Sequence, residues 1–432
     1  MPEGQTISNS DAKFLSTPIV ALLICIVCTY FPLLYTYLPV LGKMKIALLA
    51  GIILLVSYLA NQQNYRNPDV YRNPIFLAWL GLLGVLILGL LVSLDRGMTL
   101  DYIKMNIKYF IVFMVMIKII DSSRRLDLVI RVFVACGVCM ALKTIINYLT
   151  GQTSLHGVYT SSRAMSIGIF GDPNDLALLY NVTLPFVLFF LVKAKKKFLP
   201  FVGILMIITA IILTFSRGGF LGLCAVGVGF SILYARKRKK YLVFMLMIVL
   251  LFWFLAPPEY SERISSIFDW EVDPETGETG TRMDAWRLVI REGLKQPVLG
   301  VGAGSSYYVA GTGSDDWHLI HNSFIQIFSE SGLLGLFFYL LLFYLPYKQY
   351  RAAVRLDHRD VGVHLLRFSM IVVSFFSYGV TIVFLPQAYS PILYTLTGFA
   401  IIQAQLISLN NNKTVKKPCQ PSQESVRSAF IG

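Results

Sequence analysis

Long apolar segments separated by short polar breaks recur along the whole chain. The segments have about the length, roughly 17 to 25 residues, that an α-helix needs to cross the hydrocarbon core of a bilayer. The pattern therefore predicts an all-α polytopic membrane protein with about twelve transmembrane helices. We expect these helices at 16–37, 44–60, 75–94, 103–120, 126–149, 174–192, 198–215, 218–235, 241–256, 324–346, 363–385 and 390–408.

Composition agrees with this pattern. Of the 432 residues, 56% are hydrophobic and only 14% are charged, whereas roughly a quarter of the residues are charged in a typical soluble domain. Most of the 38 Lys and Arg residues collect in one set of alternate breaks, for example KAKKK at 193–197 and ARKRKK at 235–240. Because positively charged loops stay in the cytoplasm, we expect both termini on the cytoplasmic side. The net charge of +14 then reflects membrane topology, and we do not expect nucleic acid as a partner.

This topology divides the chain into four regions. Residues 1–256 are expected to hold the first nine transmembrane helices with short loops. Residues 257–322 form the largest loop on the outer face, and residues 323–410 hold the last three helices. Residues 411–432 are expected to be a disordered, basic cytoplasmic tail.

The largest outer loop contains 11 of the 24 acidic residues and three of the five tryptophans. Loops longer than about 15 residues are commonly functional or disordered. Within this loop, the stretch GTRMDAWRLVIREGLKQPVLGVG places apolar residues at helical spacing before Gly and Pro interrupt the pattern. We therefore expect half of the loop to be helical and ordered.

Arginines near the outer face are candidates for binding an anion. Arg217 lies in the very short loop LTFSRGGF, where Gly218 and Gly219 are expected to leave backbone amides uncovered at a helix N-terminus. Such amides beside a guanidinium suit a phosphate group. Arg282 precedes the predicted outer helix, and Arg163 lies in the outer loop 150–173. Each arginine also has a simpler interpretation, as an interfacial side chain that reaches lipid headgroups or solvent.

The outer loop 150–173 ends in Asp-Pro-Asn-Asp. This sequence is typical of a turn followed by a helix N-cap, and we expect it to open the sixth transmembrane helix.

Two histidines lie in WHLIHNSF, at the exit of the largest outer loop. His321 is followed by Asn322 and then by an apolar helix, and a neutral imidazole there could take a proton from a hydroxyl group near neutral pH. His318 would flank the site. The alternative is that both are ordinary hydrogen-bonding residues. A metal bound by these histidines with Asp315 and Asp316 is conceivable, but the spacing is not a specific ligand pattern, so we expect neither metal nor cofactor.

Taken in order along the chain, these motifs resemble the O-antigen ligase and polymerase superfamily. The signature of the superfamily is an Arg after a transmembrane helix, an Arg-x-x-x-Trp helix, a Pro-x-x-Gly-x-Gly turn, and His-Asn before a Gly-x-x-Gly helix. The chain carries SRGG, TRMDAWRLVIREGLKQPVLGVGAG and HNSFIQIFSESGLLG in that order. The matching residues are Arg217, Arg282, Trp286, Pro297, Gly300, Gly302, His321 and Asn322.

The resemblance implies a membrane-embedded glycosyltransferase of the GT-C type, in the bacterial inner membrane with its active site on the periplasmic face. A glycan on undecaprenyl diphosphate would be transferred, with inversion and without metal, to a sugar hydroxyl. In the ligases that acceptor is the lipid A-core oligosaccharide. His321 would then be the general base, and Arg217 and Arg282 would hold the diphosphate. Arg163, His318, Asn322 and Trp286 are possible supporting residues.

Two other functions stay open at this stage. The first is a polymerase for O-antigen or exopolysaccharide, or a ligase for another acceptor such as a protein. The second is a polysaccharide transporter or flippase, although repeated halves with interrupted helices, typical of transporters, are not evident. The sequence does not identify the sugars, the chain length or the oligomeric state.

Overall fold

The computed structural model describes residues 14–65, 68–151, 172–233, 281–306, 320–355 and 362–415. Helices lie at eleven of the twelve predicted positions, and the ninth, 241–256, lies outside the described residues. The α-helices are α2 (Thr17–Tyr30), α3 (Leu33–Tyr37), α4 (Pro39–Lys43), α5 (Ile46–Ala60), α6 (Pro74–Gly89), α7 (Arg96–Ile119), α8 (Ser123–Leu149), α9 (Pro173–Lys193), α10 (Phe198–Leu213), α11 (Arg217–Leu233), α14 (Thr281–Lys295), α16 (Ser323–Arg355), α17 (Gly362–Thr381) and α18 (Pro391–Val415). Short 3₁₀ helices are η1 (Gln62–Asn64), η2 (Pro68–Arg72) and η5 (Ile382–Phe384).

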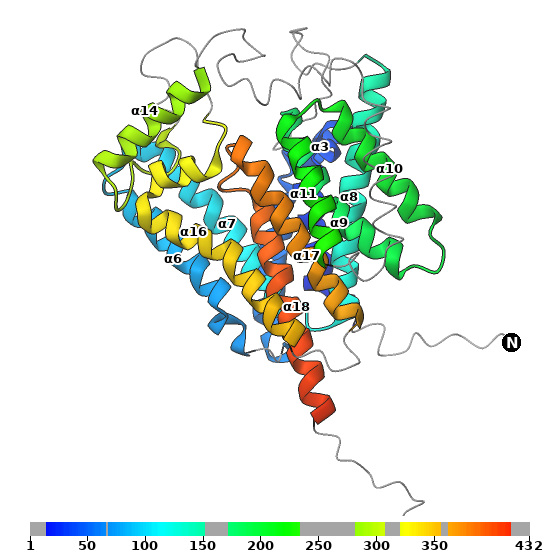
Figure 1. Ribbon diagram of the computed structural model, residues 1–432. Coiled ribbons are helices and arrows are strands. Elements are labelled where there is room, and N and C mark those ends of the chain that lie inside the picture. The colour runs from blue at the N-terminus through cyan, green and yellow to red at the C-terminus, as the bar shows by residue number, and fades with distance from the viewer. Residues whose placement is uncertain are drawn as a thin grey trace, which may run out of the picture.

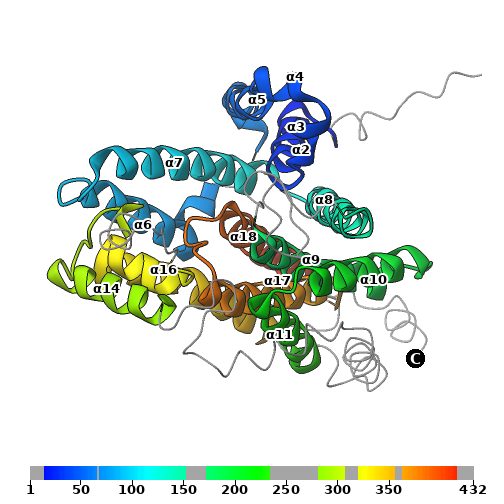
Figure 2. The ribbon, with the colours of Figure 1, turned by 90° about the horizontal axis from the view of Figure 1, so that it is seen from above.

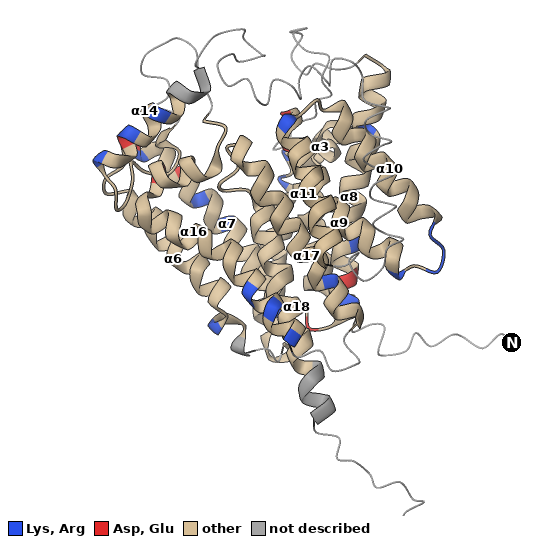
Figure 3. Cartoon of the chain, viewed as in Figure 1, with Lys and Arg blue, Asp and Glu red and all other residues tan. Residues whose placement is uncertain are grey.

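Several of these helices have the properties of membrane spans. In the part of the chain that the structure describes, five helical segments are long and apolar enough to cross a bilayer: Ser123–Leu149, Pro173–Lys193, Ser323–Arg355, Gly362–Phe384 and Pro391–Leu409. Figure 3 shows that Lys and Arg lie mostly toward the two ends of the bundle, with a largely uncharged band between them. The protein is therefore a helical membrane protein, and the count of twelve spans stays a prediction.

Helix α9 lies at the centre of one half of the bundle (Figures 1 and 2). It packs against α8, α10, α11 and α17, and its side chains are buried along nearly its whole length. A helix that is apolar on all sides and enclosed by other helices is expected to behave in this way. In the other half, α16 packs against α6, and α14 covers the beginning of α16.

The predicted first helix, 16–37, is divided in the structure. Pro32 has no amide hydrogen, and Phe31 before it leaves the helical region with φ −130° and ψ 64°. Helix α2 therefore ends at Tyr30, and the short helix α3 begins at Leu33.

Helix α16 is also interrupted, at Gly332, where φ is 64° and ψ is −166°. The segment that follows α14, residues 296–306, supplies hydrogen bonds across this break; we call it the glycine-rich segment. The amides of Val301 and Gly302 donate to the carbonyls of Ser329 and Glu330 at 2.9 and 3.0 Å. In the other direction, the amide of Leu333 donates to the carbonyl oxygen of Pro297 at 2.8 Å. Backbone groups inside a bilayer have no water to bond, so the segment replaces the bonds that the break removes.

Glycines allow the glycine-rich segment and α16 to approach each other this closely. A Cβ atom on Gly332 would lie 2.3 Å from the backbone carbonyl of Val298, and one on Gly300 would lie 2.4 Å from the carbonyl oxygen of Ser329. Residues 300–306 are buried as a result. They belong to the segment 257–322 that was expected to be an outer loop, and they pack against α16 and the start of α7.

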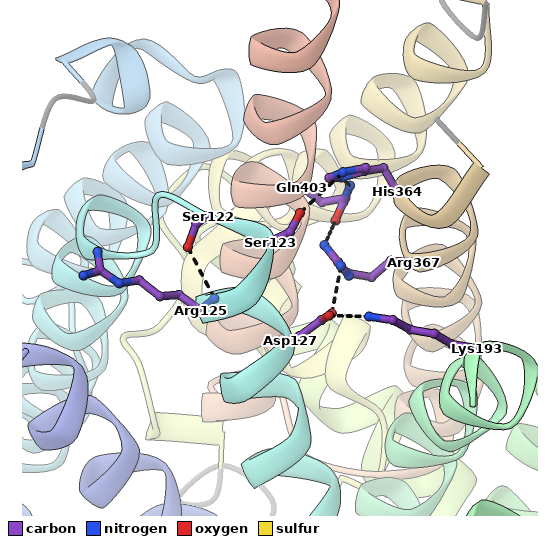
Figure 4. Close-up of polar contacts among 8 residues, drawn as sticks. All are labelled: Ser122, Ser123, Arg125, Asp127, Lys193, His364, Arg367 and Gln403. Atoms are coloured by element: carbon purple, nitrogen blue, oxygen red, sulfur yellow. Dashed lines mark hydrogen bonds and ion pairs between the residues drawn. The ribbon is translucent and has the colours of Figure 1, made fainter. Parts of the chain in front are cut away.

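Figure 4 shows a polar cluster at the opposite end of α17 from η5. Asp127 of α8 forms ion pairs with Arg367 of α17 at 2.7 Å and with Lys193 of α9 at 2.5 Å. A second nitrogen of Arg367 donates to Gln403 of α18 at 2.9 Å. Because the Arg367 side chain is only 1% exposed, its charge requires this pairing. The cluster therefore fixes four helices relative to one another.

The break in α16 makes a stability prediction. We expect Gly332→Ala to destabilise the protein by about 3 kcal/mol or more, because alanine is strained at this φ and ψ and its Cβ would overlap Val298. The measurement is the thermal unfolding midpoint of the purified protein in detergent. Gly84→Ala in α6 is the control, since a Cβ there meets no atom within 4 Å. Equal midpoints for the two variants would contradict this account of the break.

Candidate functional site

His321 precedes α16 in an unusual backbone conformation. Its φ is +43°, in the left-handed region that costs most residues other than glycine about 1 kcal/mol or more. The next residue, Asn322, caps the helix: its Oδ1 accepts from the amides of Phe324 and Ile325 at 3.0 and 3.1 Å. The His321 side chain is partly exposed. The cap thus holds a strained histidine at the surface of the bundle.

Trp286 fixes the chain on the other side of His321. The indole Nε1 donates to the carbonyl oxygen of Ile320 at 2.5 Å. Ile320 and Val289 are buried together, with Trp286 packed against them. Arg282 lies one helical turn before Trp286, in the first turn of α14, so its backbone is close to the same place. The side chain of Arg282 lies outside the described residues.

Ser323 links the start of α16 to residues 382–390, which we call the α17–α18 connection. The Ser323 hydroxyl donates to the carbonyl oxygen of Leu385 at 2.6 Å and accepts from the amide of Gln387 at 2.8 Å. Ser323 is fully buried. The residues after His321 are therefore attached to the end of α17 as well as to their own helix.

Arg217 is the first residue of α11 and is partly exposed. Ser216 caps this helix, since its Oγ accepts from the amide of Gly219 at 3.0 Å. The prediction that the amide of Gly219 is uncovered is therefore wrong. The glycines serve close packing instead: a Cβ on Gly218 would lie 3.1 Å from Phe384, and one on Gly219 would lie 2.6 Å from Ala177.

These contacts place Arg217 and His321 beside the same connection. Gly218, next to Arg217, packs against Phe384, and the following carbonyl, that of Leu385, accepts from Ser323 near His321. The structure thus brings the beginnings of α11 and α16 to one end of the bundle. Trp286 brings α14 to this end as well.

Asp175 and Gln387 are polar residues at this end that the sequence analysis missed. The Gln387 side-chain amide donates to Asp175 Oδ1 at 2.8 Å, and the Gln387 carbonyl accepts from the Tyr378 hydroxyl at 2.9 Å. The Asp-Pro-Asn-Asp sequence opens α9 as predicted, and its first residue, Asp172, is the cap, accepting from the amide of Asn174 at 2.6 Å. A usable signal for Asp175 and Gln387 was their position toward the same predicted face: Asp175 is at the start of the predicted helix 174–192, and Gln387 is in the short break between the last two predicted helices.

Within the α17–α18 connection, Tyr389 packs beside Glu330 of α16. The Tyr389 hydroxyl lies 3.5 Å from that of Ser331. Burial raises the pKa of the Tyr389 phenol, and the adjacent Glu330 carboxylate raises it further. The Tyr389 hydroxyl therefore stays protonated near neutral pH. Glu330 also accepts from the hydroxyl of Ser306, which holds the end of the glycine-rich segment.

Arg163 and His318 lie outside the described residues, as do Asp315 and Asp316 of the alternative metal site. Among the residues that are described, no group of three or more His, Cys, Asp and Glu side chains is arranged to share a metal ion.

The site therefore combines three kinds of side chain at one end of the bundle. It has an accessible imidazole that can accept a proton, an arginine at a helix N-terminus that can hold an anion, and a carboxylate with an amide that can bind hydroxyl groups. This set suits transfer of a group from an anionic leaving group to a hydroxyl.

Comparison with known proteins gives an independent result. Residues 201–340 match the model of the family described as O-antigen ligase, and this range includes Arg217, Arg282, Trp286 and His321. The resemblance drawn from the motifs is thereby confirmed. The chain is also 27% identical over 210 residues to a protein of Rickettsia felis named "Putative polysaccharide ligase". That match covers 46% of this chain, and the chain spans about half (51%) of the length of the relative.

The cap of α16 gives a testable prediction. We expect Asn322→Ala to lower stability by about 1 kcal/mol, because two amides lose their acceptor. Asn322→Asp should stay close to the wild type, since aspartate caps a helix equally well. The measurement is the thermal unfolding midpoint, together with hydrogen exchange at Phe324 and Ile325. Unchanged exchange in the alanine variant would show that Asn322 does not hold this turn.

Proposed function

We propose that this protein is an O-antigen ligase of the GT-C type. It transfers O-antigen polysaccharide from undecaprenyl diphosphate to a sugar hydroxyl of the lipid A-core oligosaccharide. The reaction takes place on the periplasmic face of the bacterial inner membrane, and both termini are cytoplasmic. The family match over 201–340 supports this proposal. It is also supported by the position of the candidate residues at one end of a membrane-spanning bundle.

The observation that carries the proposal is the position of His321. A strained backbone is maintained only where its surroundings hold it, and such positions are common at functional sites. Here Trp286 holds the carbonyl before His321, and Asn322 caps the helix after it. The imidazole is partly exposed and therefore accessible to a substrate.

In the proposed reaction, His321 accepts the proton of the acceptor hydroxyl as its oxygen attacks the anomeric carbon of the donor. The bond between that carbon and the diphosphate oxygen breaks, and undecaprenyl diphosphate leaves with the electron pair. A single displacement of this kind inverts the anomeric carbon. One general base is sufficient for it.

The leaving diphosphate needs compensation for its developing negative charge. We assign this role to Arg217 and Arg282, because a guanidinium matches phosphate oxygens through two parallel hydrogen bonds. Trp286 and Asn322 position the base, and Arg163 and His318 are supporting residues. The proposed mechanism uses no metal and no cofactor.

Lipopolysaccharide from a deletion strain tests the proposed activity. Loss of a ligase leaves bare core, with long polymer retained on undecaprenyl diphosphate. Loss of a polymerase instead leaves core that carries one repeat unit. The second result would replace the proposed function by O-antigen polymerisation.

Replacement of the base gives the first functional prediction. We expect His321→Ala to abolish transfer while membrane insertion and binding of the lipid-linked donor persist, because removal of a base spares recognition. His318→Ala should have a milder effect. The measurement is glycan transfer by the purified variants in the presence of EDTA. Transfer by His321→Ala at the wild-type rate would remove His321 from the role of base.

The arginines give the second functional prediction. We expect Arg217→Lys and Arg282→Lys each to reduce transfer by about tenfold to a thousandfold, since lysine keeps the charge but not the paired donors. If either arginine only reached lipid headgroups, lysine would serve nearly as well. The measurement is turnover of undecaprenyl-diphosphate-linked glycan, with insertion checked in parallel. Near-wild-type turnover in a lysine variant would return that arginine to an interfacial role.

A further inference from the structure

Among the acidic side chains of the described bundle, Glu330, Asp127 and Asp175 differ in their surroundings. Glu330 is fully buried and bonded within the protein, and Asp127 is occupied by Arg367 and Lys193. Asp175, in contrast, is partly exposed and lies in the first turn of α9, at the end that carries His321. Of these three carboxylates, Asp175 is therefore the one placed to meet a ligand.

Asp175 has a fixed orientation toward the site. Its Oδ1 accepts from the Gln387 side chain at 2.8 Å. The backbone of Gln387 is itself held by two further hydrogen bonds. Its backbone amide donates to Ser323 Oγ at 2.8 Å, and its backbone carbonyl oxygen accepts from the Tyr378 hydroxyl at 2.9 Å. Two hydrogen bonds, through Gln387 and Ser323, thus join the carboxylate to the second residue after His321. The carboxylate is held in place before any substrate arrives.

The chemistry of the Asp175 side chain indicates which substrate it would contact. An aspartic acid offers no cationic donor to the diphosphate of the donor, so Asp175 is unsuited to bind the leaving group. Its two oxygen atoms can form hydrogen bonds with the hydroxyl groups of a sugar. The Gln387 side chain is partly exposed beside it and offers a carbonyl oxygen to the same kind of ligand.

We propose that Asp175, oriented by Gln387, binds a hydroxyl group of the acceptor sugar and so presents the neighbouring hydroxyl to His321. This inference rests on the proposed function and adds to it the residues that recognise the acceptor. Asp175 also lies in the first turn of α9, so its replacement can also change the stability of the helix. The experiment must therefore separate recognition of the acceptor from stability of the helix.

The test compares the same substitution at two neighbouring positions. Asp175→Asn keeps an oxygen that can accept from Gln387 but replaces the other carboxyl oxygen by an NH2 group. Asp172→Asn makes the same change three residues earlier and keeps the N-cap, because asparagine caps as well as aspartate does. We expect Asp175→Asn to raise the KM for lipid A-core oligosaccharide by about tenfold, with the KM for the donor and the kcat within about twofold. Asp172→Asn should leave all three unchanged.

Equal effects of the two substitutions would overturn the proposal, and so would a fall in kcat with an unchanged KM for the acceptor. Direct calorimetric binding of lipid A-core oligosaccharide to the wild type and both variants is the second readout. If the wild type catalyses no transfer and does not bind this lipid, the proposed function fails and the inference fails with it. If the wild type transfers glycan and Asp175→Asn binds the acceptor as tightly as the wild type does, only the inference fails.

Discussion

The arrangement of the site depends on the backbone hydrogen bonds that close the break in α16. A bilayer offers no water to an interrupted helix, so the freed carbonyl and amide groups must find partners within the protein. The glycine-rich segment provides them on both sides of Gly332. Because this segment follows α14 directly, the hydrogen bonds that close the break also hold α14 against the start of α16. Trp286 can then reach the carbonyl of Ile320, and His321 is held between α14 and the N-cap of α16.

The apolar segments predicted the helices well, because burial in lipid or among helices requires uninterrupted apolar sequence in either case. They did not predict the breaks equally well. Pro32 carries a local signal for the end of α2, although the apolar pattern continues across it. Gly332 carries almost none, since a glycine is ordinary within an apolar helix of a membrane protein. The break at Gly332 depends on partners about 30 residues away in the chain, and no local pattern reports them.

The candidate site shows the same limit. His321, Asn322 and Trp286 could be found from short motifs, because each lies at a helix end or at helical spacing. Asp175 and Gln387 meet only after α9 and α17 have packed together, so their pairing could not be predicted from either stretch alone. The Gly219 amide, which was wrongly predicted to be uncovered, is a different case. Ser216 precedes it by three residues, which is the spacing of a helix N-cap, and that local signal was available.

The cluster around Asp127 has a consequence for how the chain is made. An unpaired arginine is costly in the interior of a membrane, and the Arg367 side chain is almost completely buried. Asp127 and Lys193 precede Arg367 in the chain, so α8 and α9 leave the ribosome before α17 does. When α17 enters the membrane, its acidic partner is already there. The order of synthesis thus supplies the counter-ion first. Arg367 can pair with Asp127 as α17 joins the earlier helices, so its charge is not exposed to lipid without a partner.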